Sequence, residues 1–311
     1  ASRRDVTWYR LSGLYLLADT FVAFFISEIL LGFGQSLVSG ADSALLYDTM
    51  IHYRKEESYL KYEGRVTMIG NFSEAFAGIF SGLLATYSLR LPFYVQSGIA
   101  FIGIPAAFML TEHAAKTRIE NSFANIVKII KYSLFTNKEL CYNIMFSGVI
   151  GAATLTMAWF VQPLLIELDT PTSWFGIIWT ILNLTVGISA LYSDRLDQKL
   201  GSNRMYAFIL FFIIGGYVAV SFNISYTGLV FLFFFYIVRG FATPILKGYI
   251  NQITFSEMRA TVLSIRNFVI RLMFAAMAPL VGWLHDLYSL SVALQATAVI
   301  IFIPGLLFLI L

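Results

Sequence analysis

The sequence contains few charged residues, one cysteine and three histidines. Asp, Glu, Lys and Arg make up 13% of its 311 residues, about half the share in ordinary globular proteins. A soluble protein of this length could not cover its surface with so few charges, which excludes a soluble enzyme and a disordered chain. The net charge of +3 is too small for a nucleic-acid-binding surface. Cys141 alone excludes an internal disulfide and a CxxC metal site, and the scattered histidines argue against zinc, so we expect no metal and no cofactor.

Hydrophobic residues make up 58% of the sequence. A helix needs about 20 apolar residues to cross the roughly 30 Å of hydrocarbon in a bilayer. Ten stretches meet this requirement: 6–25, 26–50, 64–87, 91–111, 141–166, 173–193, 205–223, 228–250, 261–284 and 288–311. We therefore expect an all-α polytopic membrane protein with ten transmembrane helices.

Lysine and arginine are concentrated in alternate connections between these spans. One set of alternate connections has a single basic residue, Arg90. The other set has many basic residues, namely Arg3, Arg4, Arg10, Arg54, Lys55, Lys61, Arg65, Lys116, Arg118, Lys128, Lys131, Lys138, Arg195, Lys199, Arg204 and Arg259. Because short cytoplasmic loops carry the excess of positive charge, the start of the chain, the 51–63 and 112–140 connections and the C-terminus are predicted to be cytoplasmic.

Residues 112–140 form the longest polar connection and divide the chain into three parts. Their apolar residues recur at helical spacing among lysines, which predicts an amphipathic helix on the membrane surface, either a plain linker or a regulatory element. We expect residues 1–111 to form four spans, 112–140 to form the linker, and 141–311 to form a six-helix bundle.

An internal repeat relates the two parts. A shift of 208 residues places Gly32-Phe-Gly34 on Gly240-Phe-Ala242, and the spans that follow begin alike, with Glu63-Gly-Arg-Val-Thr67 and Glu257-Met-Arg-Ala-Thr261. The second and third spans therefore correspond to the eighth and ninth. If the second half has six helices, the first half lacks its first two.

These motifs resemble those of the major facilitator superfamily (MFS) of secondary transporters, along essentially the whole chain. The stretch Ser39-Gly-Ala-Asp-Ser-Ala-Leu-Leu-Tyr-Asp48 is similar to the fourth-helix signature of a bacterial drug- and metabolite-exporter branch. The residues 239–246 and 257–264 resemble the same branch's tenth-to-eleventh-helix segment. Asp194-Arg195, Gly201 and Arg204 are similar to the superfamily's loop motif Gly-x-x-x-Asp-Arg-x-Gly-Arg-Lys, although the gap before Gly201 is longer.

The resemblance implies two pseudo-symmetric bundles of which helices three to twelve are present. A fragment, a truncated gene and a genuine ten-span protein all remain open. The resemblance also implies a secondary active transporter of the bacterial inner membrane, with a small-molecule substrate and no enzymatic activity.

Ionisable residues inside predicted spans are candidates for function because burial in a bilayer is costly. Glu74, Arg239 and Arg271 fall near the membrane midplane and Asp42 in the inner third of its span. Glu74 and Asp42 are candidates for proton coupling, or alternatively for structural hydrogen bonds. Arg239 and Arg271 are candidates for contact with an anionic substrate, or alternatively for fixed ion pairs between helices.

A second group of polar residues lies at the predicted cytoplasmic ends of the spans. By resemblance these residues form a gate of ion pairs that holds the two halves together, and the alternative is charge retention and helix capping. The gate candidates are Asp48, Arg65, Asp194, Arg195, Gly201, Arg204, Glu257 and Arg259. Expected partners are Arg3, Arg4 or Arg65 for Asp48, and Arg195 or Arg204 for Asp194.

The resulting hypothesis is a monomeric, alternating-access transporter that exports a small amphiphile or organic anion in exchange for protons. The alternatives are uptake of an anionic metabolite, a non-transporting membrane scaffold or receptor, and, least favoured, a membrane enzyme that modifies lipids. The bilayer, the substrate and protons are the expected partners, and nucleic acid is not.

Overall fold

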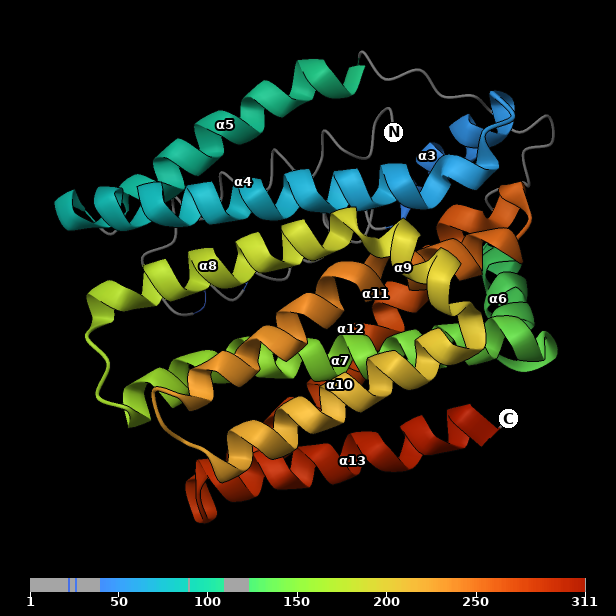
Figure 1. The fold of residues 1–311 in the computed structure, drawn as a ribbon. Helices are drawn as coiled ribbons and strands as arrows, with labels where there is room; N and C mark the ends of the chain where they lie inside the picture. Colours follow the sequence, from blue (N-terminus) through green and yellow to red (C-terminus); the bar gives the residue numbers. More distant parts are fainter. Residues whose placement is uncertain (1–21, 23–25, 27–39, 89, 109–122, 311) are drawn as a thin grey trace.

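The computed structural model describes residues 40–88, 90–108 and 123–310, together with Val22 and Ile26. Within these ranges all regular secondary structure is helical. Most of the first two predicted spans lies outside the described residues. Figure 1 shows the long helices running roughly parallel or antiparallel along one direction of the molecule, whereas the short helix α6 (Phe123–Lys131) runs across them.

The first half of the chain contributes three helices to the described structure, and the second half contributes the rest. The first three are α3 (Ala41–His52), α4 (Tyr59–Tyr87) and α5 (Leu91–Phe108), with a 3-10 turn at Glu56–Ser58 before α4. The linker forms α6 (Phe123–Lys131) and a π-helical turn (Tyr132–Thr136). The second half forms α7 (Lys138–Glu167), α8 (Thr172–Leu191), α9 (Ser193–Leu200), α10 (Ser202–Phe222), a 3-10 turn (Gly228–Phe231), α11 (Leu232–Gln252), α12 (Ser256–Leu287) and α13 (Leu290–Ile310).

The protein is an all-helical membrane protein, as predicted. Six helices in the described part are long and apolar enough to cross a membrane, namely α7, α8, α10, α11, α12 and α13. They coincide with the six spans expected after residue 140. The helices α4 and α5 coincide with the third and fourth predicted spans. The total of ten spans stays a prediction because its first two fall largely outside the described ranges.

Two local features differ from the expectation. The helix α4 begins at Tyr59, so its first turn includes part of the predicted 51–63 connection. The polar run 193–200 folds into the short helix α9 and ends at Gly201, whose φ of 72° favours glycine. Within the range 112–140 the described residues include the helix α6, with Lys128 and Lys131 in its last turn.

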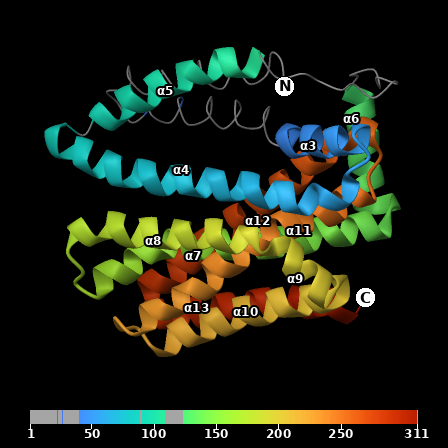
Figure 2. The same ribbon diagram turned by 45° about the horizontal axis from the view of Figure 1, so that its top comes forward.

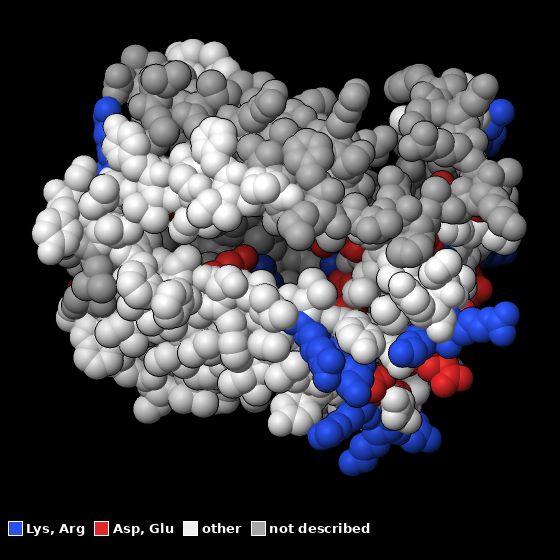
Figure 3. Space-filling model, turned by 90° about the horizontal axis from the view of Figure 1, so that it is seen from above, with Lys and Arg blue, Asp and Glu red and all other residues white. Residues whose placement is uncertain are grey.

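Charged side chains mark one end of the bundle. The helices α3, α6 and α9 lie at this end in both ribbon views (Figure 1, Figure 2). Figure 3 shows most of the visible Lys and Arg side chains gathered there. We call it the basic end.

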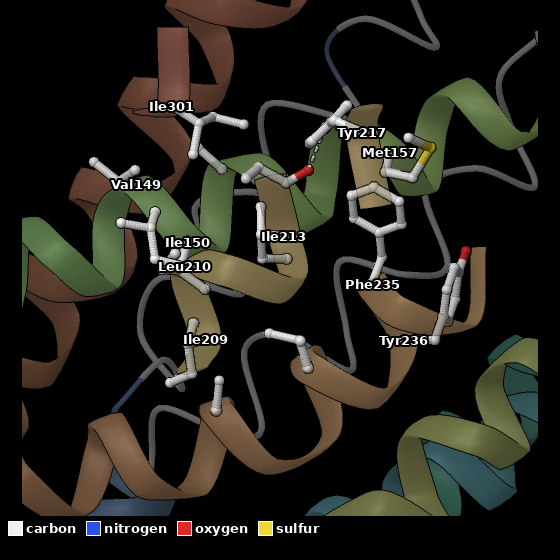
Figure 4. Packing of buried hydrophobic residues seen from close by; sticks show 14 of the residues in the cluster. Val149, Ile150, Met157, Ile209, Leu210, Ile213, Tyr217, Phe235, Tyr236 and Ile301 are labelled. Atoms are coloured by element: carbon white, nitrogen blue, oxygen red, sulfur yellow. Dashed lines mark hydrogen bonds between the residues drawn. The ribbon is translucent and has the colours of Figure 1, made fainter. Parts of the chain in front are cut away.

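The second half has a tightly packed interior. Figure 4 shows Met157, Ile213, Tyr217 and Phe235 meeting between α7, α10 and α11. The rings of Tyr217 and Phe235 make an edge-to-face contact with centroids 4.8 Å apart, and the Tyr217 hydroxyl donates to the carbonyl of Ala153 at 2.7 Å. Since apolar burial gains little in a bilayer, such close packing and satisfied polar groups hold the helices together.

Candidate functional site

Glu63 of α4 and Lys247 of α11 form an ion pair between the two halves at the basic end. The Lys247 Nζ lies 2.9 Å from Glu63 Oε1 and 2.8 Å from Ser43 Oγ. Ser43, on α3, donates to the same Glu63 oxygen at 2.8 Å. The Glu63 side chain is 1% exposed and that of Lys247 16% exposed. Three helices are therefore joined through one buried carboxylate.

A second polar contact continues the same seam. Asn251 Nδ2 donates to the hydroxyl of Tyr59 at 2.8 Å, one helical turn from Lys247 and Glu63 on α11 and α4. Tyr59 and Asn251 are both buried. The Tyr59 ring also makes an edge-to-face contact with Tyr47 of α3, with centroids 4.8 Å apart.

Asp48 and Arg259 form the second ion pair between the halves. A guanidinium NH of Arg259, at the start of α12, contacts Asp48 Oδ1, which also accepts from Ser256 Oγ at 2.7 Å. Arg259 is 4% exposed, donates to the Thr254 carbonyl at 2.8 Å, and has its guanidinium carbon 4.3 Å from the centre of the Tyr47 ring. Carboxylate, carbonyl and ring together replace part of the water that this buried cation has lost, and its Nε has no hydrogen-bond partner among the described residues. We call the residues Ser43, Asp48, Glu63, Lys247, Ser256 and Arg259 the gate cluster.

Glycines allow the helices that carry the gate cluster to approach closely. A Cβ on Gly64 would lie 2.4 Å from the Ala190 carbonyl oxygen of α8, and one on Gly240 would lie 2.4 Å from the Val186 carbonyl oxygen. At the start of α3, Gly40 has a φ of 83° and packs against Leu263 of α12, where an added Cβ would be 2.7 Å from the Leu263 Cβ. The contacts of Gly40 and Gly64 join the two halves, so a larger residue at either position would push the halves apart, whereas the contact of Gly240 lies within the second half.

The structure pairs the predicted gate residues differently from the expectation. Asp48 contacts Arg259 rather than Arg65, and Arg3 and Arg4 lie outside the described residues. Asp194 accepts a hydrogen bond from Gln198 on its own helix at 3.0 Å, and no ion pair joins it to Arg195 or Arg204 in the described part.

The remaining gate candidates lie on the surface of the basic end. The guanidinium carbons of Arg65 and Arg195 lie 5.4 Å and 5.8 Å from the ring centres of Tyr62 and Tyr192. Arg204 and Glu257 are exposed, and Gly201 ends α9. Of the eight candidates, Asp48 and Arg259 are the two that the described structure brings together across the halves.

Of the four candidates inside predicted spans, Glu74, Arg239 and Arg271 form no ion pair with the gate cluster in the described part of the chain. Glu74 is exposed on α4, one turn after Asn71, and Arg271 is exposed on α12, whereas Arg239 of α11 is partly buried. Asp42 is exposed on α3, beside the buried Ser43. Among the described residues no ion pair joins these four side chains. Figure 3 shows a hollow in the face that carries α4 and α5, with acidic and basic side chains inside it.

The Glu63–Lys247 pair was not among the predicted site residues. Glu63 entered the sequence analysis as part of the repeat. A signal was available, because Lys247 is a cation inside a predicted membrane span and such a charge requires a partner. Arg266 was also missed: it is 5% exposed and donates to Ser147 of α7 and to Asn267 at 2.9 Å. In the described ranges no group of three or more His, Cys, Asp or Glu residues is placed to hold a metal.

Apolar helices in two halves, joined at one end by buried ion pairs, define a multi-pass helical membrane protein. The Major Facilitator Superfamily model matches residues 7–269, so the chain belongs to this superfamily.

Solved structures with this fold resemble the chain over 98% of its length. A variant of the E. coli fucose:proton symporter FucP has a TM-score of 0.70 at 13% identity, with 80% of that chain covered. The human organic anion transporter MFSD10 (TETRAN) has a TM-score of 0.74 at 12% identity, with 75% covered. FucP in the outward conformation has a TM-score of 0.71 at 11% identity, with 79% covered. The comparison with curated proteins gave no match.

Proposed function

We propose that this protein is a secondary active transporter that works by alternating access, with the gate cluster closing its basic end. The observation that carries the proposal is the position of the two buried ion pairs, Glu63–Lys247 and Asp48–Arg259. Each joins a helix of the first half to a helix of the second. The basic end cannot open unless both pairs separate, so they distinguish the two end states of a transport cycle.

The charge distribution supports placing the basic end in the cytoplasm, since short cytoplasmic loops carry the excess of Lys and Arg. The arrangement then corresponds to a state closed toward the cytoplasm. We further propose that the protein acts as a monomer in a bacterial inner membrane, with its C-terminus cytoplasmic.

Proton coupling is proposed at Glu74, with Asp42 as a second candidate. Glu74 lies in the middle of α4, where a carboxyl that faces a passage between the halves would take up and release protons as the passage opens to either side. Arg239 and Arg271 would supply positive charge to an anionic substrate. The likeness to an organic anion transporter and to a proton symporter supports these roles.

Export of a small amphiphile or organic anion in exchange for protons is the proposed reaction. Uptake of an anionic metabolite is the main alternative, because the same charges would serve either direction. A non-transporting scaffold or receptor is a further alternative. A lipid-modifying enzyme is the least favoured, since family membership indicates a transporter.

Transport in vesicles with an imposed pH gradient tests the proposal. Purified protein in liposomes should move a fluorescent organic anion or an amphiphilic dye faster when the gradient is present, and a protonophore should remove the stimulation. If protein-free liposomes accumulate every tested anion and amphiphile as fast as liposomes that contain the protein, transport is excluded.

A further inference from the structure

A cavity of 1170 Å³ lies at the basic end, apart from the gate cluster. Its walls come from the π-helical turn after α6, the start of α7, α9, the start of α10 and the end of α11. No lining residue belongs to the first half of the chain. The cavity is therefore lined by the segment after α6 and by the second half, and it does not lie between the two halves.

Three tyrosine side chains form one wall of this cavity. The rings of Tyr142 and Tyr206 meet edge to face with centroids 5.3 Å apart, and those of Tyr206 and Tyr249 lie 5.6 Å apart. Tyr206 donates to Asn143 Oδ1 at 2.6 Å, and Asn143 donates in turn to the Glu139 carbonyl at 2.9 Å. These bonds hold the aromatic wall in a fixed orientation before any ligand arrives.

Asp197 places a negative charge beside the aromatic wall. It is partly buried in the middle of α9 and accepts a hydrogen bond from the Tyr249 hydroxyl. Burial raises the pKa of the Asp197 carboxyl, Asp194 adds to the increase, and the bond from Tyr249 opposes it. No cation pairs with Asp197 in the described part of the chain. A carboxylate in this position has lost water without gaining a counter-charge.

The other charged residues that line the cavity do not neutralise Asp197. Lys138 and Glu139 are adjacent at the start of α7, carry opposite charges and are both exposed, so water screens their effect on the interior. Phe135, on the linker beside the cavity, is 80% exposed. An exposed phenylalanine on an amphipathic linker offers a surface for an apolar chain next to a polar pocket.

We propose that this cavity binds the ammonium group of an amphiphile, with Asp197 as its counter-ion and the tyrosine rings of Tyr206 and Tyr249 against its alkyl substituents. Aromatic rings together with one carboxylate are the recurring means of recognising ammonium groups. The ammonium group comes either from a soluble organic amine or from the headgroup of a phospholipid. This binding does not depend on the proposed transport reaction, so it is tested separately.

The single cysteine of the chain provides the reporter. Cys141 lines the cavity and is the only thiol in the sequence. In nanodiscs of phosphatidylglycerol, which has no ammonium group, benzyltrimethylammonium should slow the reaction of Cys141 with N-ethylmaleimide. Phenylmethanesulfonate, an anion of similar size, should not. In nanodiscs of phosphatidylethanolamine the reaction should be slow without added probe if the lipid headgroup is the ligand.

Variants separate specific binding from general effects. Asp197→Asn should weaken protection by benzyltrimethylammonium about tenfold in Kd, whereas Asp169→Asn, the same change at an exposed site at the far end of α7, should leave it unaltered. If Asp197→Asn does not fold, the cation-to-anion comparison on the wild-type protein still decides the question. Protection of Cys141 that depends on Asp197 supports the proposal. Protection by the added probe in phosphatidylglycerol nanodiscs indicates a soluble amine, and protection without the probe in phosphatidylethanolamine nanodiscs indicates the lipid headgroup. Equal labelling under all conditions, or protection that persists in Asp197→Asn, overturns it.

Discussion

Lys247 and Glu63 lie 184 residues apart in the sequence, yet their charged atoms are 2.9 Å apart in the interior of the protein. Removing one partner of a buried pair leaves the other charge without compensation, at a cost of about 3–5 kcal/mol. Because the pair joins the two halves, this cost falls on the state in which the basic end is closed. The states of a transporter differ by only a few kcal/mol, so one substitution here changes their populations.

Glu63→Gln is therefore expected to open the basic end. A cysteine introduced at Ser43, in a Cys141→Ser background, should react faster with a membrane-impermeant maleimide in the Glu63→Gln variant than with Glu63 present. The double variant Glu63→Gln, Lys247→Met removes both charges and should recover part of the protection. Equal reactivity in all three proteins would contradict a role for the pair in closure.

Asp48→Asn should also open the basic end, because it disrupts the second ion pair, Asp48–Arg259. The buried guanidinium of Arg259 would lose its counter-ion while keeping its contacts with the Thr254 carbonyl and the Tyr47 ring. Turnover should fall, and substrate affinity measured in one conformation should change little. Ser256→Ala removes a hydroxyl that donates to the Asp48 carboxylate but leaves both charges in place, so it serves as the milder control, at about 1.5–3 kcal/mol. Loss of substrate binding in Asp48→Asn would assign Asp48 to the substrate site instead.

Gly64→Ala should disturb the contact between α4 and α8, because the new Cβ would lie 2.4 Å from a backbone oxygen that cannot move aside alone. We expect a lower melting temperature and slower transport. Gly70→Ala is the matched control on the same helix, since nothing lies within 4 Å of its Cβ position and alanine favours a helix by about 1 kcal/mol over glycine. Indistinguishable behaviour of the two variants would mean that the close approach is unimportant.

Glu74→Gln tests the proposed proton coupling. The substitution retains size and hydrogen bonding but removes titration, so proton-driven accumulation should stop while exchange of substrate without a gradient continues. Transport at several pH values in liposomes checks this, with Asp42→Asn as the parallel variant. If the pH dependence of Glu74→Gln matches that of the wild type, the coupling group lies elsewhere.

The orientation in the membrane gives a separate prediction. With Cys141 replaced by serine, cysteines at Thr170 or Ser225 should react with an impermeant maleimide added to intact cells, and one at Lys199 should not. The first two lie at the opposite end of the bundle from α9. Labelling of Lys199→Cys from outside would reverse the topology and place the basic end outside the cell.

The sequence by itself determined the membrane class, the helical fold and the position of the basic end. The length of an apolar stretch and the positions of Lys and Arg are local properties that can be read directly from the sequence. They predict the spans because the free energy of placing a segment in the hydrocarbon of a bilayer depends mainly on the residues of that segment. For this reason the six spans of the second half coincide with six helices. The polar run 193–200 was not predicted as a helix because it is only 8 residues long, and a single apolar pair at helical spacing, Leu196 and Leu200, is a weak signal.

Only the tertiary structure decided which charges meet. Asp48 was expected to pair with Arg3, Arg4 or Arg65; Arg3 and Arg4 lie outside the described residues, and the described structure places Asp48 against Arg259, 211 residues away. Glu63 was known only as part of a repeat, and it proved to be the buried partner of Lys247. A pair between helices depends on how far each helix rotates and slides against its neighbour. In this protein the close approaches at Gly40 and Gly64 set that register, and no spacing within one helix encodes it.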